Sequence, residues 1–168
     1  MTGSFDIRDA HPGDGAQLAA IYNDYVASTI VTFEVDAVAG DDMRGRIAAV
    51  QEDGLPWLVA QDAAGDILGY AYATRWRARA AYRHSVESSI YLAPQMTGRG
   101  IGRRLYQCLL EQLRARGLHM VIGGAALPNP ASVALHEALG FTQSAHLREV
   151  GHKFGRWIDV GYWQLRLD

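Results

Sequence analysis

The alternation of apolar and polar residues predicts a domain built from both strands and helices. Period-two alternation and short apolar runs, typical of strands, occur at residues 5–8, 57–60, 67–74, 85–92, 118–122, 143–150 and 158–167. Apolar residues repeat at three- and four-residue steps, as on one helix face, at residues 18–26, 43–50, 101–113 and 130–139. The order β-α-α-β-β-β-α-β-α-β-β predicts an α/β fold with a mixed, mostly antiparallel central sheet flanked by helices.

Local signals define some of the connections. Asn129 is a preferred N-cap residue, Pro130 suits a first helical turn, and Gly140 is expected to end that short helix. Residues 29–35 are β-branched around a phenylalanine and are expected to be extended. Residues 151–156 are expected to connect the last two strands.

Three alternating glycines stand between the strand at 85–92 and the next helix. Gly98, Gly100 and Gly102 border a helix start, where unpaired backbone N–H groups and the helix dipole favour a phosphate or pyrophosphate. A Walker loop is excluded, because no glycine is followed by Lys and Ser or Thr. A dinucleotide fingerprint is disfavoured, because Arg103 stands where the third glycine belongs. A phosphate- or pyrophosphate-binding loop of another kind and a glycine-rich turn without a ligand remain.

Composition narrows the class of protein. A chain of 168 residues with 49% hydrophobic and 20% charged residues fits one globular domain, expected to span residues 1–168. A net charge of -2 gives no general attraction to nucleic acid or to anionic lipid, and no apolar run approaches the roughly 18 residues of a membrane span, so we expect neither partner. The single cysteine, Cys108, excludes an internal disulfide. With no signal-peptide core in residues 1–8, a cytoplasmic location is expected.

Two ionisable residues are candidates for chemistry. Glu87 shares one face of its strand with Ser89 and Tyr91, and is either a solvated carboxylate or a general base. His136 lies on an apolar helix face, where it is either a packing residue or a catalytic one. A metal site is not expected, because the histidines form no i, i+4 pair and have no cysteine partner.

Four arginines crowd the segment before Glu87. A solvated basic loop is one interpretation of Arg75, Arg77, Arg79 and Arg83. The other is a bidentate clamp on a carboxylate, because guanidinium geometry matches a carboxylate while lysine offers a point charge. We expect Arg77 and Arg83 to form such a clamp for an amino acid.

Several segments resemble a known family. Residues 86–91, 135–141 and 150–160, together with 21–23 and 31–34, are similar to the phosphinothricin N-acetyltransferase family of the Gcn5-related N-acetyltransferase (GNAT) superfamily. The run Thr97-Gly98-Arg99-Gly100-Ile101-Gly102 resembles the acyl-CoA pyrophosphate loop of that superfamily, with Thr97 in place of the usual Gln or Arg. Residues 129–136 resemble its N-x-x-A-x-x-L-Y pattern, with His136 where relatives carry tyrosine.

The resemblance implies a GNAT fold, acetyl-CoA as co-substrate and particular roles for residues. Glu87 is implied as the base, His136 or a water as the proton donor to the CoA thiolate, and backbone N–H groups near residues 91 and 92 as the oxyanion site. Contacts to acetyl-CoA are implied for Ile90, Tyr91, Leu92, Gly98, Arg99, Gly100, Ile101, Gly102, Arg103 and Asn129. Acceptor contacts are expected from Phe33, Arg77, Arg83 and Lys153.

The implied reaction is acetylation of the α-amino group of a small amino acid analogue, of the phosphinothricin, methionine sulfoximine or methionine sulfone type, by direct attack on the thioester. Two alternatives stay open: acetylation of a protein N-terminus or ribosomal protein, and a non-catalytic acyl-CoA sensor. Relatives are commonly dimers, so a homodimer is expected, with Phe154, Trp157 and Trp163 as candidate interface residues.

Overall fold

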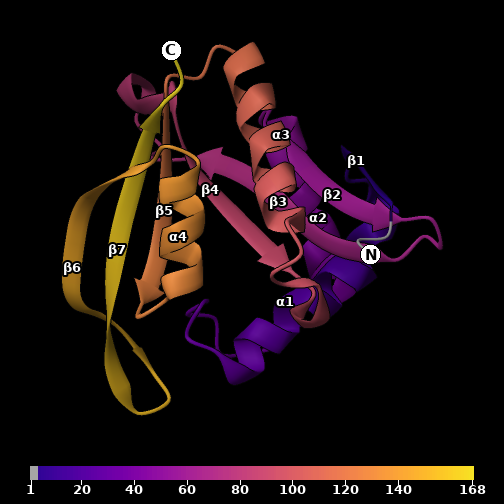
Figure 1. Cartoon of the computed structure of the whole chain (residues 1–168), viewed down its shortest axis with the longest axis horizontal. Helices are drawn as coiled ribbons and strands as arrows, with labels where there is room; N and C mark the ends of the chain where they lie inside the picture. Colours follow the sequence, from indigo (N-terminus) through magenta and orange to yellow (C-terminus); the bar gives the residue numbers. More distant parts are fainter. Residues whose placement is uncertain (1–3) are drawn as a thin grey trace.

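A seven-stranded sheet runs through residues 4–168, the part of the chain that this computed structural model describes (Figure 1). Residues 1–3, part of the N-terminal stretch considered above, lie outside the described residues. The strand order is β1-β2-β3-β4-β5-β7-β6, and every neighbouring pair is antiparallel except β4 and β5. The strands are β1 (Phe5–Asp9), β2 (Trp57–Asp62), β3 (Ile67–Arg75), β4 (Ser85–Leu92), β5 (Met120–Leu127), β6 (Thr142–Lys153) and β7 (Arg156–Arg166).

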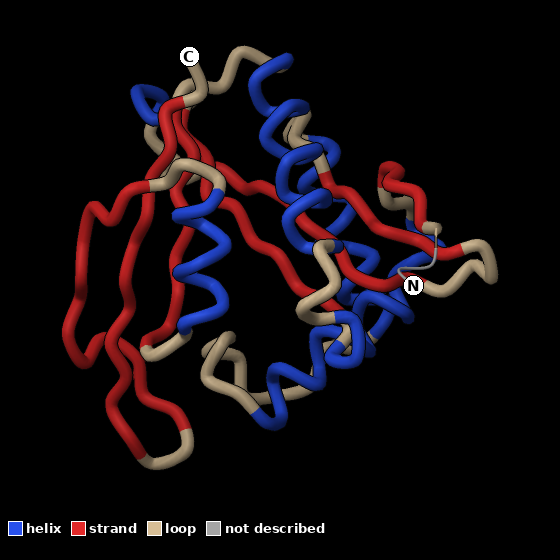
Figure 2. Tube along the Cα trace, viewed as in Figure 1, coloured by secondary structure: helices blue, strands red, loops and turns tan. Residues whose placement is uncertain are grey.

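Helices cover both faces of the sheet, with α3 and α4 on one face and α1 and α2 on the other (Figure 2). Their bounds are α1 (Gly15–Ser28), α2 (Gly40–Glu52), α3 (Ile101–Ala115) and α4 (Pro130–Ala138). The observed order of strands and helices confirms the predicted one, and the sheet is mixed and mostly antiparallel as expected. No helix among residues 4–168 is both long enough and apolar enough to cross a membrane.

The apolar stripe predicted along α3 lies in the core. Ile101, Leu105, Leu109 and Leu113 are all buried, and they pack beneath the sheet among the other buried residues of the domain. Burying a side chain of this size contributes roughly 1.5–3 kcal/mol, so the stripe accounts for the position of the helix. Because α3 is anchored in this way, its N-terminus and the glycine loop before it are held at a defined place beside β4.

Two predicted boundaries are wrong. The strand expected at 118–122 runs from Met120 to Leu127, because the glycines and alanines after Ile122 conceal a strand that packs between two neighbours. Residues 151–156 are not a loop: β6 continues to Lys153, and β7 begins at Arg156 after a tight turn. In that turn Phe154 and Gly155 have φ angles of 51° and 71°. Residues 29–35 belong to the loop between α1 and α2.

The sheet opens where its two parallel strands diverge. β4 pairs with β5 from Ser85↔Met120 to Ser88↔Gly123, and within residues 4–168 this pairing ends there. Beyond that point β4 continues beside β3 as far as Leu92, while β5 continues beside β7. The backbone groups on the β5 side of the end of β4 therefore have no strand partner among the described residues, and the gap between the strands is available for a ligand.

Candidate active site

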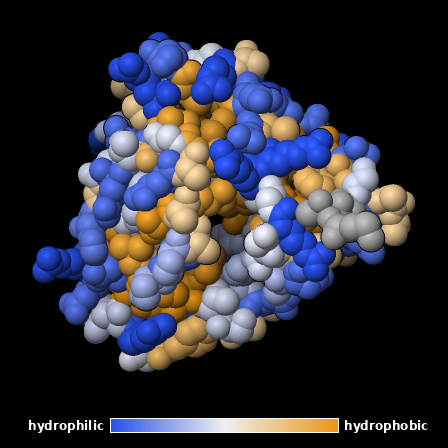
Figure 3. Space-filling view, viewed as in Figure 1, coloured by the Kyte–Doolittle hydropathy of each residue, from blue (hydrophilic) through white to orange (hydrophobic). Residues whose placement is uncertain are grey.

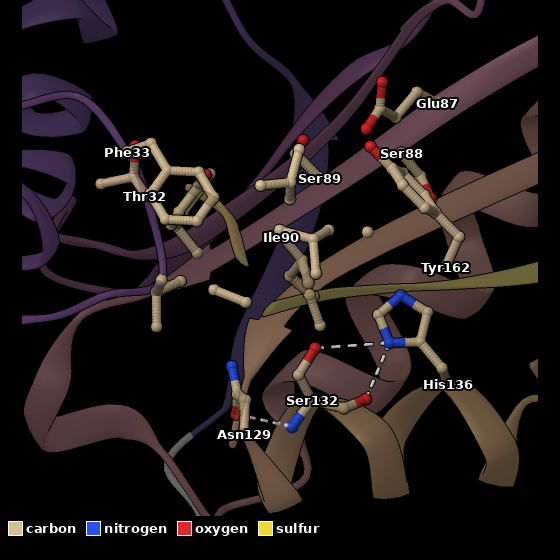
Figure 4. Close-up of a pocket in the computed structure, with 17 residues that line it drawn as sticks. Thr32, Phe33, Glu87, Ser88, Ser89, Ile90, Asn129, Ser132, His136 and Tyr162 are labelled. Atoms are coloured by element: carbon tan, nitrogen blue, oxygen red, sulfur yellow. Dashed lines mark hydrogen bonds between the residues drawn. The ribbon is translucent and has the colours of Figure 1, made fainter. Parts of the chain in front are cut away.

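A cavity of about 370 Å³ lies in this opening. Figure 3 shows the molecule hollowed near its centre, with hydrophobic side chains to the left of the hollow and more hydrophilic ones to its right. Figure 4 shows the side chains that converge on the cavity from β4, β5, β6, β7, α4 and the α1–α2 loop. The lining residues are Val31, Thr32, Phe33, Glu87, Ser88, Ser89, Ile90, Tyr91, Gly124, Ala125, Ala126, Asn129, Ser132, His136, Val150, Val160 and Tyr162.

The two faces of β4 divide the cavity into two sides. Ser88 points toward α3, where its hydroxyl group meets that of Tyr106. Tyr91 points the other way and stacks edge-on against Tyr22 and Tyr25 of α1. Because side chains alternate along a strand, Glu87 lies on the α1 side with Tyr91, and the glycine loop at the start of α3 lies on the opposite side. A ligand bound at the glycine loop and a second ligand beside Glu87 would meet through the opening.

Glu87 is a half-buried carboxylate at the point where the strands part. It pairs across the sheet with Thr74 of β3 and Ile122 of β5, one residue before the pairing of β4 and β5 ends. Burial raises the pKa of the Glu87 carboxyl above its usual value, and the charge of Arg77 opposes this shift more weakly. Tyr162 also has a raised pKa, first because its own hydroxyl is partly buried and second because of the negative charge of Glu87. A carboxylate with a raised pKa facing a cavity is suited to accepting a proton.

The two arginines expected to form a clamp lie in different surroundings. Arg77 is near enough to influence the pKa of Glu87, and its guanidinium group lies 4.8 Å from the ring centre of Trp76. Trp76 in turn packs edge-on against Tyr162, which lines the cavity. Arg83 is exposed, follows the short helical turn at residues 80–82, and donates to the carbonyl of Ala80 at 3.3 Å. Neither arginine is among the described residues that line the cavity.

His136 is buried on the α3–α4 side and is held at both ring nitrogens. Nδ1 donates to the carbonyl oxygen of Ser132 at 2.7 Å, so Nε2 carries no proton and accepts from the Tyr106 hydroxyl at 3.1 Å. The Tyr106 oxygen in turn accepts from Ser88, which completes a chain of three polar side chains. Burial lowers the pKa of His136, and the hydrogen bond to Ser132 opposes this more weakly. The imidazole is therefore neutral near pH 7.

Asn129 confirms its predicted capping role. It is the N-cap of α4, and its side-chain oxygen accepts from the backbone N–H of Ser132 at 3.1 Å. It also lines the cavity, near the lower left of the view in Figure 4. The capping bond occupies the side-chain oxygen, while the amide NH₂ group offers donors at the cavity wall.

The glycine loop has the backbone shape of an anion cradle. Gly98 and Gly100 have φ angles of 73° and 78°, and on either residue no described atom beyond the adjacent residues lies within 4 Å of the place that a Cβ would take. Gly100 is the N-cap of α3, and Ile101, Gly102 and Arg103 form its first turn, with amides directed out of the helix. Arg99 lies in the loop beside these amides and borders a smaller neighbouring pocket. A diphosphate would lie against these amides without meeting a side-chain carbon.

The end of β4 connects the loop to the cavity. Ile90 and Tyr91 line the cavity, whereas Leu92 packs against Gly102, where a Cβ would lie 3.2 Å from a methyl group of Leu92. The carbonyl of Leu92 accepts from the Tyr25 hydroxyl at 2.6 Å. Two of the three β4 residues expected to contact acetyl-CoA thus face the cavity, and the third positions the start of α3.

Phe33 forms part of the cavity wall opposite Glu87, at the left of Figure 4. Its loop is tied down by several hydrogen bonds. Thr32 accepts from or donates to the Tyr22 hydroxyl at 2.7 Å, and the Asn23 side chain bonds both backbone groups of Val38. Lys153, only 3% exposed, donates from Nζ to the carbonyl of Thr32 at 2.8 Å, and burial lowers its pKa. Lys153 therefore stabilises the loop that carries Phe33 through this hydrogen bond.

Some site residues were not foreseen from the sequence. Tyr106 sits one position after Leu105 of the apolar stripe and resembles any core aromatic until the fold places it between Ser88 and His136. Tyr162 could have been noticed from the alternation of apolar residues in its strand, which directs it to the same face as Val160. Ser132 contacts Nδ1 of His136 through its carbonyl oxygen at 2.7 Å and its hydroxyl at 3.4 Å, and the i, i+4 spacing of the two residues is the signal that could have indicated this.

Comparisons with known proteins agree with this architecture. The family described as the acetyltransferase (GNAT) domain matches residues 7–161. The L-methionine sulfoximine/L-methionine sulfone acetyltransferase of Pseudomonas paraeruginosa is 41% identical over 98% of this chain and 96% of the relative. The phosphinothricin N-acetyltransferase of Streptomyces viridochromogenes is 40% identical over 95% of this chain and 86% of the relative. A crystal structure of a GNAT superfamily phosphinothricin acetyltransferase from Sinorhizobium meliloti, in complex with acetyl-CoA, has a TM-score of 0.93 and is 36% identical, covering 96% of this chain and 88% of that one.

Matches of this length and identity confirm the resemblance first seen in the motifs. The seven-stranded sheet that opens between β4 and β5 is accordingly the GNAT fold. The chain belongs to the GNAT family of acetyltransferases, together with the phosphinothricin and methionine sulfoximine N-acetyltransferases.

Proposed function

We propose that this protein transfers the acetyl group of acetyl-CoA to the α-amino group of a small amino acid analogue of the phosphinothricin, methionine sulfoximine or methionine sulfone type. The observation that supports this most directly is the position of Glu87, a half-buried carboxylate on the α1 side of an opening whose other side begins at an anion-binding helix start. The names of the relatives supply the substrate class.

Acetyl-CoA fits the loop and the opening. Its diphosphate lies on the amides of residues 98–103, and its thioester arm enters between β4 and β5 past Asn129. The thioester oxygen gains negative charge as the amine attacks, and backbone N–H groups near Tyr91 and Leu92 stabilise that charge, because β4 has no β5 partner there among the described residues. In this arrangement the thioester carbon lies in the opening between β4 and β5.

The acceptor binds on the α1 side, with its amine toward Glu87. The amine attacks only in its unprotonated form, and Glu87 takes one proton from it, directly or through a water, as the nitrogen attacks the thioester carbon. The carbonyl then re-forms, the C–S bond breaks, and the acetyl group stays on nitrogen. Arg77, beside Glu87, is assigned to the acceptor carboxylate, while Phe33 contacts the side chain. Arg83, which was also expected in the clamp, is exposed and serves as the comparison.

The departing CoA sulfur takes up a proton. The one ring proton of His136 is on Nδ1 and is hydrogen-bonded to the carbonyl oxygen of Ser132, so His136 directs no proton at the cavity. The Tyr106 hydroxyl directs its own proton to Nε2 of His136 and is fully buried, so we assign the proton to a water and keep His136 as a residue that lines this side of the cavity. The protein is further proposed to act in the cytoplasm and to form a homodimer. Phe154 and Trp157 are 58% and 64% exposed on the β6–β7 hairpin and are assigned to the interface, whereas Trp163, also expected there, is 2% exposed and belongs to the core.

The deciding experiment is a substrate panel. Purified protein is mixed with acetyl-CoA and with amino acid analogues, ordinary amino acids, peptides with free N-termini and buffer alone, while free CoA thiol and the acetylated product are measured. Turnover with the analogues and not with peptides supports the proposal. Turnover confined to peptides would move the acceptor to a protein N-terminus. Binding of acetyl-CoA with no turnover on any amine would favour the alternative of a non-catalytic acyl-CoA sensor.

A further inference from the structure

Strand β6 carries a bulge with two extra residues, and it lies opposite one residue of β7. Leu147 pairs with Val160 and Gly151 pairs with Ile158, so four steps along β6 match two steps along β7 and two residues are extra. Within the bulge, Glu149 has a φ of 51°, which a residue with a side chain adopts only when its surroundings hold it there. A bulge of this kind leaves backbone groups without their partners in the sheet.

The carboxylate of Asp159, the residue between Ile158 and Val160, replaces those partners. Its Oδ1 accepts from the backbone N–H of Glu149 at 2.8 Å, and its Oδ2 accepts from Nε2 of His146 at 2.7 Å. The N–H of Glu149 and, more weakly, His146 lower the pKa of Asp159, so the carboxylate is ionised at neutral pH. The Asp159 side chain thus holds the bulge at Glu149, in its middle, and at His146, just before it starts.

The bulge forms part of the cavity wall. Val150, inside it, lines the cavity with Phe33. The next residue, Gly151, faces the Phe33 ring so closely that a Cβ would lie 2.3 Å from Cζ of Phe33. Two residues further on, Lys153 holds the carbonyl of Thr32, as described above. The path of β6 between residues 147 and 153 therefore decides where Phe33 lies.

We propose that Asp159 is a positioning residue for acceptor specificity: by holding the β6 bulge it sets Val150 and Gly151 against Phe33, and so fixes the shape of the cavity wall that meets the acceptor side chain. The inference rests on the proposed function, because it takes this wall to face the acceptor. Asp159 touches neither substrate in this scheme. It lies outside the glycine loop and the β4 end, so acetyl-CoA binding is not expected to depend on it.

The test compares Asp159→Ala and Asp159→Asn with a matched control, Asp168→Asn. Asp168 forms a similar surface contact with a histidine, 3.3 Å from Nδ1 of His119, at the end of the chain. For each protein the apparent KM for acetyl-CoA and the kcat/KM for acceptors with short and long side chains are measured. Asp159→Ala is expected to change the ratio of kcat/KM between the short and long acceptors by about tenfold, the scale on which pocket shape discriminates between side chains. The KM for acetyl-CoA stays within about twofold, and Asp168→Asn changes neither value.

Asp159→Asn separates the two hydrogen bonds. Its amide oxygen still accepts from Glu149, while the charge toward His146 is lost, so a smaller change in the ratio is expected. Exchange of the Glu149 amide hydrogen gives a readout independent of turnover, and this amide should lose protection in Asp159→Ala. Circular dichroism and gel filtration show whether each variant keeps its fold and assembly, and if Asp159→Ala does not, Asp159→Asn and His146→Ala carry the test.

The outcomes separate the inference from the function beneath it. Two results would show that Asp159 does not set acceptor specificity, provided that the wild-type protein acetylates amines. In the first, the folded Asp159 variants keep the wild-type ratio of kcat/KM between short and long acceptors. In the second, the KM for acetyl-CoA rises by as large a factor as that ratio changes. If the wild-type protein acetylates no amine, the proposed function is wrong and the inference is withdrawn with it.

Discussion

His136 occupies the space that any side chain at position 123 would need. A Cβ on Gly123 would lie 2.3 Å from Nε2 of His136, the nitrogen that accepts from Tyr106. Gly123 is also the last residue of β5 that pairs with β4. The histidine ring, the tyrosine hydroxyl and the point where the strands part are therefore packed against one another, so a substitution at one is expected to disturb the others.

Gly123→Ala is expected to lower the free energy of unfolding by about 1–3 kcal/mol, because the added methyl group displaces the His136 ring from its hydrogen bonds. Urea unfolding measures the change. Gly45→Ala is the matched control. Gly45 lies inside α2, and no described atom beyond its adjacent residues and the backbone of its own helix lies within 4 Å of a Cβ position, so alanine there should stabilise the helix by roughly 0.5–1 kcal/mol. Equal stability of Gly123→Ala and wild type would contradict the packing described here.

Glu87→Gln should lower the turnover about 10²–10⁴-fold and remove the part of the acidic limb of the pH–rate profile that comes from the carboxyl, while the part that comes from protonation of the acceptor amine remains. In the wild type, kcat/KM falls as pH drops through the pKa of Glu87, because the protonated carboxyl accepts no proton. Since burial raises that pKa, the fall begins at a higher pH than the roughly 4.3 of an ordinary glutamate. The measurement is kcat/KM against pH at saturating acetyl-CoA. A variant profile that keeps both parts of this limb would assign the base to another group.

His136 is expected to make the fold sensitive to mild acid. Its folded-state pKa lies below the value of about 6.5 in the unfolded chain, so below that pH the unfolded state binds more protons. The stability contributed by the neutral ring is complete above the unfolded pKa and is lost as the pH falls from there toward the folded pKa. Unfolding free energies of wild type and His136→Gln at several pH values isolate the effect, because both proteins share the remaining histidines. Parallel curves would show that His136 titrates alike in both states.

Arg77→Lys should raise the apparent KM for the amino acid acceptor about tenfold and leave the KM for acetyl-CoA nearly unchanged, because lysine loses the bidentate contact with a carboxylate. Arg83→Lys provides the comparison, since Arg83 was expected in the same clamp and lies exposed beside Ala80. Steady-state kinetics with each substrate varied in turn decide between them. A larger effect at Arg83 than at Arg77 would place the clamp on the other arginine.

Gly100→Ala is expected to raise the KM for acetyl-CoA through the loop. A side chain at a φ of 78° costs roughly 1–2 kcal/mol, and its methyl group points into the space assigned to the diphosphate. Gly155→Ala shares the strain, with a φ of 71° and equally open surroundings, but lies in the β6–β7 turn. The two variants should lose similar stability in a thermal melt, while only Gly100→Ala weakens binding of acetyl-CoA in calorimetry. Similar affinities in both would mean that the loop does not hold the diphosphate.

Local patterns were sufficient for the elements and for the family. The apolar stripe of α3, the cap at Asn129 and the glycine loop each depend on neighbours within a few residues, so they can be recognised from the sequence, and each is found in the structure. The sequence-based prediction was wrong where the local pattern is ambiguous. Gly123 and Gly124, which are not typical strand residues, lie in the middle of β5, so its second half was not predicted. The turn at Phe154 was not predicted because phenylalanine rarely adopts a positive φ.

Alternation along the chain determined that Glu87 and Tyr91 share a face and that Ser88 faces the other way, because side chains in a strand point to opposite sides in turn. Only the tertiary structure decided what each face meets. It brought Tyr106 to His136 across thirty positions of the sequence, placed Arg77 near Glu87 while leaving Arg83 exposed, and turned Lys153 toward the carbonyl of Thr32. These contacts join segments far apart in the chain, and their geometry depends on how helices and strands pack, which no local pattern of residues encodes.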